Sequence, residues 1–316
     1  MMSDKKRFLS RLRRISVIII TVLFLFSALS MVVTKFVYDG IFSRYDTPAD
    51  IPKELSATVD SRTVHTLFSG ENQLTGYFYP NDKPEKAYGL IVLVPGFHAG
   101  GDNYLWQIRS LLDYGWSVFT FDPTGSLRSQ GKNQVGFSQL IPDLEAVLKY
   151  IEKNQNFGYN DIVLMGHSRG GYAACCVLAR ETDIAAVVSV SGVNSAMEGI
   201  MQMSAGAVGP VAYGNYGFLW LYQAILFGED TLELDAAEAI SESDVPVLVI
   251  HGTRDDQIPM DRSSIISHKE EISSGNVEYL TCPAGHTDLL YDGDGTASDT
   301  LMQDIHEFLI RCLEQP

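Results

Sequence analysis

The sequence predicts an α/β fold with a mostly parallel sheet that is covered by helices on both faces. Two observations predict it. Short apolar runs of strand length recur along the chain, and segments with helical periodicity separate them. Continuous apolar runs are typical of strands buried on both faces, and their alternation with helices is typical of parallel sheets. At 316 residues the chain has room for one such domain and a smaller appendage.

The predicted elements begin with residues 62–68 and 73–79, which alternate in polarity and predict a hairpin at the edge of the sheet. Further strands are predicted at 89–94, 116–121, 161–165, 184–190, 245–250 and 277–282. Helices are predicted at 106–114, 137–154, 171 to about 180, 259–274 and 298–314.

A long apolar run lies near the amino terminus. Residues 15–34 carry no charge, and a helix of this length spans about 30 Å, the hydrocarbon thickness of a bilayer. Residues 1–14 precede it with six basic residues and one acidic residue, a net charge of +5. The positive-inside rule then predicts a cytoplasmic amino terminus and an exported domain. We expect a single-pass signal anchor in the cell membrane; the alternative is a signal peptide cleaved near the small residues at 27–30.

Charge and composition exclude some classes of partner. The formal net charge is −16, so the chain beyond residue 14 carries about −21. Such a domain would repel a phosphate backbone, and we expect no nucleic-acid partner. The four cysteines and seven histidines show no zinc-ligand spacing. We therefore expect neither a metal nor an organic cofactor.

Residues 35–60 are expected to form a juxtamembrane stalk. Tyr38 and Phe42 belong to a short apolar pattern of helical spacing, which predicts an amphipathic helix lying on the bilayer or on the domain. Pro48 and nearby Pro52 then interrupt regular structure. The folded domain is expected to cover residues 61–316.

Residues 192–243 interrupt the alternation of strands and helices. The segment is rich in methionine, small residues and aromatic residues. We expect it to form an inserted helical cap over the carboxyl edge of the sheet, where it would provide an adaptable apolar roof. The alternative is that it continues the ordinary α/β core.

The stretch Gly166-His167-Ser168-Arg169-Gly170 lies between a predicted strand and a predicted helix. A strand, a Gly-x-Ser-x-Gly turn and a helix in this order are typical of a nucleophile elbow. The glycines leave room for a turn so tight that the Ser168 hydroxyl stands clear of the backbone. The pattern predicts that Ser168 is a nucleophile.

A serine nucleophile needs a base and a carboxylate that orients the base. Asp255 directly follows the predicted strand at 245–250, and we prefer it to its neighbour Asp256 as the carboxylate. Either aspartate could instead cap the helix expected to start near Pro259. His286 follows the next predicted strand in a loop of small residues, and it is the best placed of the histidines to act as the base.

The developing negative charge of a reacting carbonyl needs two backbone N–H donors. We expect one from Arg169, directly after the nucleophile, and one from Phe97, in the glycine-rich turn after the strand at 89–94. For the Arg169 side chain two roles stay open. It could pair with an acidic group on the surface or meet an anionic substrate.

Together these residues resemble the α/β-hydrolase superfamily over about residues 61–315. Within the superfamily the chain looks like the monoacylglycerol-lipase and serine-aminopeptidase-like branch. The matching stretches are PGF at 95–97, GHSRGG at 166–171, HGTRDDQIP at 251–259 and AGH at 284–286. The resemblance implies Ser168, Asp255 and His286 as a catalytic triad, with Phe97 and Arg169 as oxyanion donors.

We expect a serine hydrolase that cleaves acyl or lipid-like carboxylic esters through an acyl-enzyme. The apolar cap and the anchor favour a lipid-like substrate. A peptidase is the first alternative, and Glu198, Glu229 and Asp230 near the cap could receive a free amino terminus. A thioesterase, an acyltransferase and an inactive binding module of the same fold stay open.

Overall fold

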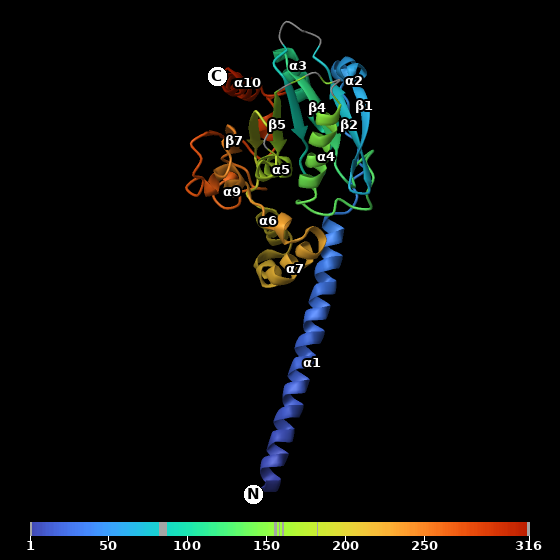
Figure 1. The fold of residues 1–316 in the computed structure, drawn as a ribbon, viewed down its shortest axis with the longest axis vertical. Helices are drawn as coiled ribbons and strands as arrows, with labels where there is room; N and C mark the ends of the chain where they lie inside the picture. Colours follow the sequence, from blue (N-terminus) through green and yellow to red (C-terminus); the bar gives the residue numbers. More distant parts are fainter. Residues whose placement is uncertain are drawn as a thin grey trace.

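The computed structural model describes residues 2–81, 87–154, 157, 159, 161–181 and 183–314. Within them lies one eight-stranded sheet with the order β1-β2-β4-β3-β5-β6-β7-β8 (Figure 1). The strands are β1 (Thr63–Ser69), β2 (Asn72–Tyr79), β3 (Leu90–Val94), β4 (Ser117–Asp122), β5 (Ile162–His167), β6 (Ala186–Val190), β7 (Val247–Gly252) and β8 (Val277–Cys282). The β1–β2 and β2–β4 pairs are antiparallel, and the other five pairs are parallel. The predicted mostly parallel α/β fold is confirmed.

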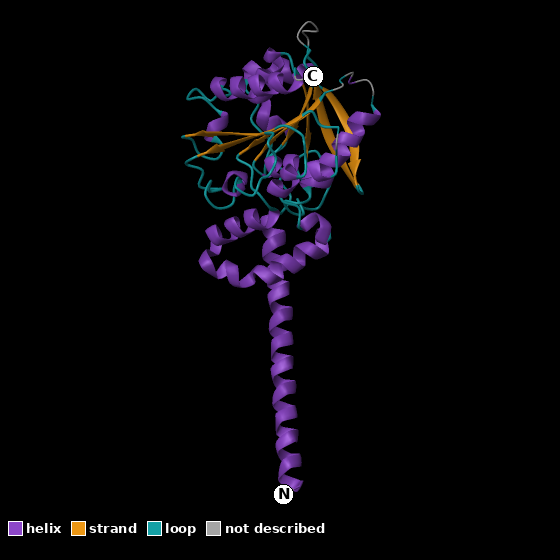
Figure 2. Ribbon diagram, turned by 60° about the vertical axis from the view of Figure 1, so that its left-hand side comes forward, coloured by secondary structure: helices purple, strands orange, loops and turns teal. Residues whose placement is uncertain are grey.

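The inner strands are apolar because both of their faces are covered. Every residue of β3, β4, β6 and β7 is buried, whereas the edge strands β1 and β8 carry exposed positions. Helices α4 (Leu140–Lys153) and α5 (Arg169–Cys176) pack on one face, and α3 (Leu105–Tyr114) and α10 (Asp299–Leu313) pack on the other (Figure 2). Because the central strands are parallel, their carboxyl ends lie at the same edge of the sheet, where loop residues can form a site.

One predicted helix is replaced by loops. The sequence predicts a helix over 259–274, but the structure forms only the short 3-10 helix η7 (Ile265–His268) there. The Ser264 hydroxyl accepts from the N–H of Ser267 at 3.1 Å. Serine hydroxyls that bond to nearby backbone groups favour tight turns over longer helices, and this explains the difference.

A group of helices is inserted between β6 and β7. These are α6 (Ala196–Val208), the 3-10 helix η6 (Gly209–Asn215), α7 (Tyr216–Phe227) and α8 (Glu229–Leu232). They lie together on the side of the domain from which α1 protrudes (Figures 1 and 2). We call residues 196–232 the cap. The next helix, α9 (Ala236–Ser241), packs against α5 and belongs to the core layer.

Helix α1 (Met2–Ile41) is continuous and extends away from the domain (Figure 1). Its stretch Lys6–Ile41 is long and apolar enough to cross a membrane, by length and composition. The end of α1 does not lead into a free stalk. Tyr38 and Phe42 are buried in the same core cluster as α4 and α5, and the Arg44 guanidinium donates to the carbonyls of Ser129 and Gly131.

Two short helices also lie inside the segment expected to be a stalk. These are η1 (Lys53–Leu55) and α2 (Ser56–Ser61), and Leu55 is buried on the α3 side of the sheet. The fold therefore extends on the amino-terminal side of residue 61 to about Tyr38. The physical reason is that the apolar rings at the end of α1 gain more by burial in the core than by contact with water.

Candidate active site

Ser168 lies at the turn between β5 and α5, and its backbone is strained. Its φ is 57° and its ψ is −121°, in a region that residues with a side chain rarely adopt. The turn closes because Gly166 and Gly170 have no side chain. A Cβ on Gly166 would lie 2.1 Å from the Gly170 carbonyl oxygen, and one on Gly170 would lie 2.1 Å from that of Val94. The glycines of the predicted elbow are therefore required by its geometry.

Asp255 and His286 meet at the carboxyl edge of the sheet. His286 Nδ1 lies 2.7 Å from Asp255 Oδ2, and both side chains are buried. The other carboxylate oxygen accepts from the N–H groups of Gln257 and Ile258 at 3.0 and 2.8 Å. Asp255 thus stabilises its own turn and also faces the imidazole. Asp256 points outward and is exposed.

A second imidazole supports the Asp255 carboxylate. His251 Nε2 lies 3.2 Å from Asp255 Oδ2 and 2.8 Å from the Ile258 carbonyl oxygen, and the ring is fully buried. Burial alone would raise the pKa of Asp255. Hydrogen bonds from His251 and His286 outweigh burial and hold the pKa well below its ordinary value. Asp255 is therefore a carboxylate at any physiological pH.

The loop that carries His286 is fixed through its main chain. The His286 carbonyl accepts from the Ser191 hydroxyl at 3.1 Å and from His167 Nε2 at the same distance. With Nε2 donating, His167 Nδ1 accepts from the Tyr104 hydroxyl at 3.0 Å. The Tyr104 oxygen in turn accepts from the Gly96 N–H at 2.9 Å. A chain of hydrogen bonds thus joins the turn after β3 to the His286 loop.

His167 belongs to this chain as a neutral ring. Burial, assisted by the neighbouring His286 ring, lowers the pKa of His167 to about 3. The sequence alone assigns no role to His167, Ser191 or Tyr104. The signal available for His167 was its place inside the Gly-x-Ser-x-Gly turn. Nothing in the sequence marked Ser191 or Tyr104.

Ser168 and His286 line one cavity of about 380 Å³. Its other lining residues come from the turn after β3, from the start of α3 and from the loops after β7 and β8: Gly96, Phe97, His98, Ala99, Asn103, Tyr104, His167, Gln257, Thr287, Leu290 and Tyr291. None of these described lining residues is an aspartate, glutamate, lysine or arginine. Among the described residues the His286 ring is hydrogen-bonded to Asp255 and not to Ser168, so the cavity brings Ser168 and His286 together without a direct hydrogen bond.

Of the two expected oxyanion donors, one lines this cavity and the other directly follows Ser168 in the chain. Phe97 lines it, and Arg169 is the first residue of α5, whose amino-terminal end carries a partial positive charge. Within the described part of the chain, no carbonyl outside regular elements accepts from the N–H of either residue. Both groups therefore remain available to a ligand.

The Arg169 side chain is buried rather than superficial. Only 1% of it is exposed, which excludes the expected pairing with a surface acid. It is also absent from the lining of the Ser168 cavity. Its Nη2 lies 3.4 Å from the Gly96 carbonyl, and its guanidinium carbon lies 5.6 Å from the centre of the Phe97 ring. The side chain therefore lies behind the turn that carries Phe97.

Burial lowers the pKa of Arg169 to about 10, although the Asp143 carboxylate works in the opposite direction. Its Nε has no partner among the described residues. A buried guanidinium with one long hydrogen bond is costly. It is tolerated here because it holds the Gly96 carbonyl and contacts the Phe97 ring.

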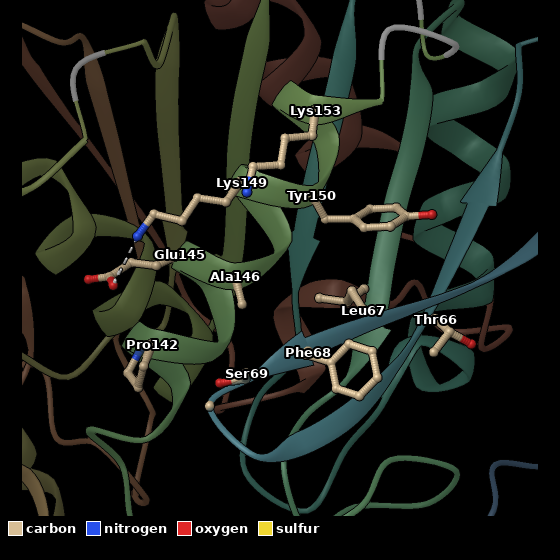
Figure 3. Close-up of a pocket in the computed structure, with 11 residues that line it drawn as sticks. Thr66, Leu67, Phe68, Ser69, Pro142, Glu145, Ala146, Lys149, Tyr150 and Lys153 are labelled. Carbon is tan, nitrogen blue, oxygen red and sulfur yellow. Dashed lines mark ion pairs between the residues drawn. The ribbon is translucent and has the colours of Figure 1, made fainter.

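Larger grooves lie elsewhere on the domain. One of about 550 Å³ is open between β1 and α4 and is lined by Phe68, Tyr150, Lys149 and Lys153 among others (Figure 3). Lys149 there approaches Glu145, and no nucleophile with a base accompanies it. Among the described residues, no group of three His, Cys, Asp or Glu side chains is placed to bind a metal ion. The Ser168 cavity is thus where chemically useful groups converge.

The fold and its sequence match define the class of protein. Residues 85–214, which include the turn after β3 and the elbow, match the family described as serine aminopeptidase, S33. The match covers about two fifths of the chain. Together with the mostly parallel eight-stranded sheet and the strand–turn–helix elbow at Ser168, it indicates an α/β-hydrolase fold.

Individual relatives are distant. The chain is 29% identical over 201 residues to the uncharacterized protein YfhR of Salmonella typhi, covering 59% of this chain and 61% of that protein. It thus spans about three fifths of the length of that relative. Among solved structures, it is similar to the Pyrococcus furiosus esterase Pf2001, with a TM-score of 0.64, 20% identity and coverage of 85% and 98% of the two chains.

A second similar structure is Est1E from Butyrivibrio proteoclasticus with ferulic acid bound. It has a TM-score of 0.61 and 18% identity, and the match covers 79% of this chain and all of that one. At such identities the likeness shows the fold alone.

Proposed function

We propose that the protein is a serine hydrolase that cleaves carboxylic esters. Ser168 Oγ bonds to the acyl carbon while His286 takes the hydroxyl proton, and His286 then gives that proton to the departing alkoxide. Water, deprotonated by His286, attacks the acyl-enzyme and releases the acid and the free serine. Asp255 fixes the imidazole tautomer and stabilises the imidazolium. The N–H groups of Phe97 and Arg169 stabilise the oxyanion.

One observation carries this proposal. His286 lies 2.7 Å from the Asp255 carboxylate and opens into the same cavity as Ser168, whose hydroxyl projects from a strained turn. A carboxylate, an imidazole and a strained serine that are spread over 118 positions, from 168 to 286, rarely meet at one edge of a sheet by chance. Such a constellation is recognised by its geometry and the roles of its members.

Esters are favoured over peptides by the charge of the cavity. A peptidase that removes amino-terminal residues needs a carboxylate to receive the substrate ammonium group, and the described cavity lining carries none. Glu198, one expected candidate, instead pairs with His268 at 2.9 Å, outside that lining. Glu229 and Asp230 are exposed on α8. A neutral acyl ester suits such a cavity best.

Labelling with a fluorophosphonate probe tests the serine proposal. The probe should label the protein, and Ser168→Ala should abolish labelling and lower turnover on the order of 10⁶-fold. Ser189→Ala is the control, because that buried serine lies in strand β6 and outside the cavity lining. Labelling that persists in Ser168→Ala would contradict the assignment. A panel of acyl esters, acyl thioesters and aminoacyl amides on the purified protein then separates the substrate classes.

We also propose that α1 anchors the protein in the cell membrane, with residues 1–14 in the cytoplasm and the catalytic domain outside it. The length of α1 and its basic amino-terminal flank support this orientation. Protease added to intact cells should degrade the domain and spare the amino terminus. Mass analysis of the mature protein distinguishes the anchor from a cleaved signal peptide.

A further inference from the structure

A second cavity, of about 300 Å³, lies between α1 and the cap. Its lining comes from the last three turns of α1 and from α6, η6 and α7: Val33, Thr34, Val37, Tyr38, Ile41, Ile200, Met201, Ser204, Ala212, Asn215 and Leu219. It shares no lining residue with the Ser168 cavity. None of the described lining residues is charged, and the surface is mostly aliphatic. The cavity is therefore suited to a hydrocarbon ligand.

Two polar side chains of this wall, Thr34 and Asn215, bind each other, whereas the buried Tyr38 hydroxyl has no partner among the described residues. Asn215 Nδ2 donates to Thr34 Oγ1 at 2.9 Å, and the Thr34 hydroxyl lies 2.8 Å from the Ser30 carbonyl. Nearby, Tyr222 of α7 donates to Asp39 of α1 at 2.7 Å. These contacts clamp the cap to α1 and leave an apolar surface between them. A polar ligand would find few free partners there.

The depth of the cavity points to a bilayer. If residues 15–34 fill the hydrocarbon layer, then Val33 lies at its edge and Ile41 lies about 10 Å further out, in the headgroup region. The cavity begins where the apolar part of α1 ends. Val37 in the cavity wall and its neighbour Phe36 are both exposed on the surface of the chain.

The cap carries an apolar surface at the same level. Its exposed large side chains are Tyr213, Tyr216, Leu221, Ile225 and Leu226. Helix α7 has no charged residue, and it contacts α1 directly. Exposed aromatic and aliphatic groups of this kind are typical of surfaces that rest on a membrane. The exposed apolar side chains of the cap therefore lie on α7 and η6, helices that also contribute to the cavity lining.

We propose that the cavity between α1 and the cap binds one acyl chain of a bilayer lipid. The proposal rests on the membrane anchoring proposed above and is independent of the hydrolytic reaction. The chain would bury the aliphatic wall formed by Val37, Ile200 and Leu219, while the lipid headgroup stays in the interfacial layer. The bound lipid would hold the cap in place against α1.

The size and isolation of the cavity argue against other occupants. A helix from a second copy is about 10 Å wide with its side chains, which is too thick for a space of about 300 Å³. The acyl tail of a substrate on Ser168 would have to cross from a cavity with entirely different walls. A single chain from a neighbouring lipid needs no such passage.

Photocrosslinking of the full-length protein in phosphatidylcholine nanodiscs tests the proposal. One acyl chain of the lipid carries a diazirine, and crosslinked peptides are mapped by mass spectrometry. We expect crosslinks on α6 near Ile200 to Ser204 as well as on α1. Ser204→Leu should fill the cavity and lower the α6 crosslinks on the order of tenfold. Gln202→Leu, two positions away on the same helix and outside the lining, should leave them unchanged.

Three outcomes would overturn the proposal: crosslinks confined to the lipid-facing side of α1, equal α6 labelling in Ser204→Leu and the parent protein, or crosslinks on α6 that disappear when Ser168 is blocked with a long-chain fluorophosphonate. The last would assign the cavity to the substrate tail. Fluorophosphonate labelling of the same samples reports on Ser168 separately. Loss of that labelling with intact α6 crosslinks would defeat the hydrolase proposal and leave the lipid site standing.

Discussion

The carboxyl edge of the sheet and the seam between α1 and the cap hold their groups in different ways. At the sheet edge, Asp255, His286 and His167 are buried and joined by hydrogen bonds of 2.7 to 3.1 Å. At the seam, the contacts between α1 and α7 surround an apolar cavity, and large side chains of the cap are exposed to solvent. In the first region, Asp255, His286 and His167 all find hydrogen-bond partners within the chain. The second leaves apolar surface for something outside it.

This difference separates the region expected to carry out the reaction from the region expected to attach the protein to its surroundings. A network of buried polar groups specifies one geometry, because each unsatisfied partner would be costly. An apolar seam can be completed by a lipid and can adjust to it. Changes at the sheet edge are therefore expected to alter the reaction, and changes at the seam to alter stability and attachment.

After the loss of the Ser168 hydroxyl itself, the largest effect is expected at the sheet edge, from Asp255→Asn. The amide oxygen would stay with the N–H groups of Gln257 and Ile258, so the amide nitrogen would face His286 Nδ1 as a donor. This favours the wrong imidazole tautomer, and turnover should fall on the order of 10⁴-fold. Asp256→Asn is the matched control, since that neighbouring carboxylate is exposed and should leave the rate unchanged. Ester hydrolysis by the two purified variants decides between them. Equal losses would show that the turn matters and the Asp255 carboxylate does not.

The seam region can be tested at its junction with the core, through Phe42→Ala. The Phe42 ring is fully buried, with ring centres 5.2 Å from Phe97 and 5.7 Å from Phe137. Its loss should lower the free energy of unfolding by about 3–5 kcal/mol. Phe36→Ala, six residues earlier and exposed, should change it little. Denaturant unfolding in detergent measures the free energy of both variants. Equal effects would show that the segment around Phe42 is a stalk and does not contribute to the folded core.

The sheet edge was largely predictable from the sequence. Buried parallel strands carry continuous apolar runs, so each loop at their carboxyl ends could be located, and Ser168, Asp255 and His286 lie in three such loops. The glycine spacing of the elbow is a local requirement and is visible without coordinates. Local patterns and a fixed topology together placed these residues at one edge.

The seam and the supporting residues were not predictable in this way. Burial of Phe42, the position of Arg169 behind Phe97 and the bond from Ser191 to the His286 carbonyl all depend on contacts between segments far apart in the chain. Arginine side chains are usually exposed, so the residue type favoured a position at the surface or against a substrate for Arg169, and not the buried position that it occupies. The segment 35–60 also contains two prolines, which predict irregular structure. Nothing in this segment therefore indicates that the end of the preceding helix packs on the core.

Arg169→Met sharpens the comparison, because this buried side chain supports the Phe97 turn at the sheet edge from behind. Methionine keeps much of the apolar contact with Phe97 but loses the bond to the Gly96 carbonyl. We expect kcat to fall on the order of tenfold as the Phe97 N–H becomes less well placed, a fraction of the cost of losing an oxyanion donor. Removing a buried charge should change Tm little. A change in KM alone would instead indicate that Arg169 contacts substrate.

The smallest effect is expected at the polar contact that joins the cap to the core. His268 lies 2.9 Å from Glu198 of α6 and 3.2 Å from Glu271. Burial alone would lower the pKa of His268, but hydrogen bonds and charge from Glu271 and Glu198 outweigh it and raise the pKa above its ordinary value of 6.5. The protonated ring is then favoured in the folded protein.

This stabilisation is fully present below pH 6.5, the pKa of an unperturbed histidine, and is lost as the pH rises through the higher pKa of the folded state. Hydrogen exchange in α6 should therefore quicken between about pH 6 and pH 8 beyond the intrinsic rate change. His268→Gln keeps a donor for Glu198 without a titratable proton, so its extra pH dependence should vanish. The same acceleration in parent and variant would mean that another group controls the cap, and that the His268–Glu198 contact follows the cap's position without setting it.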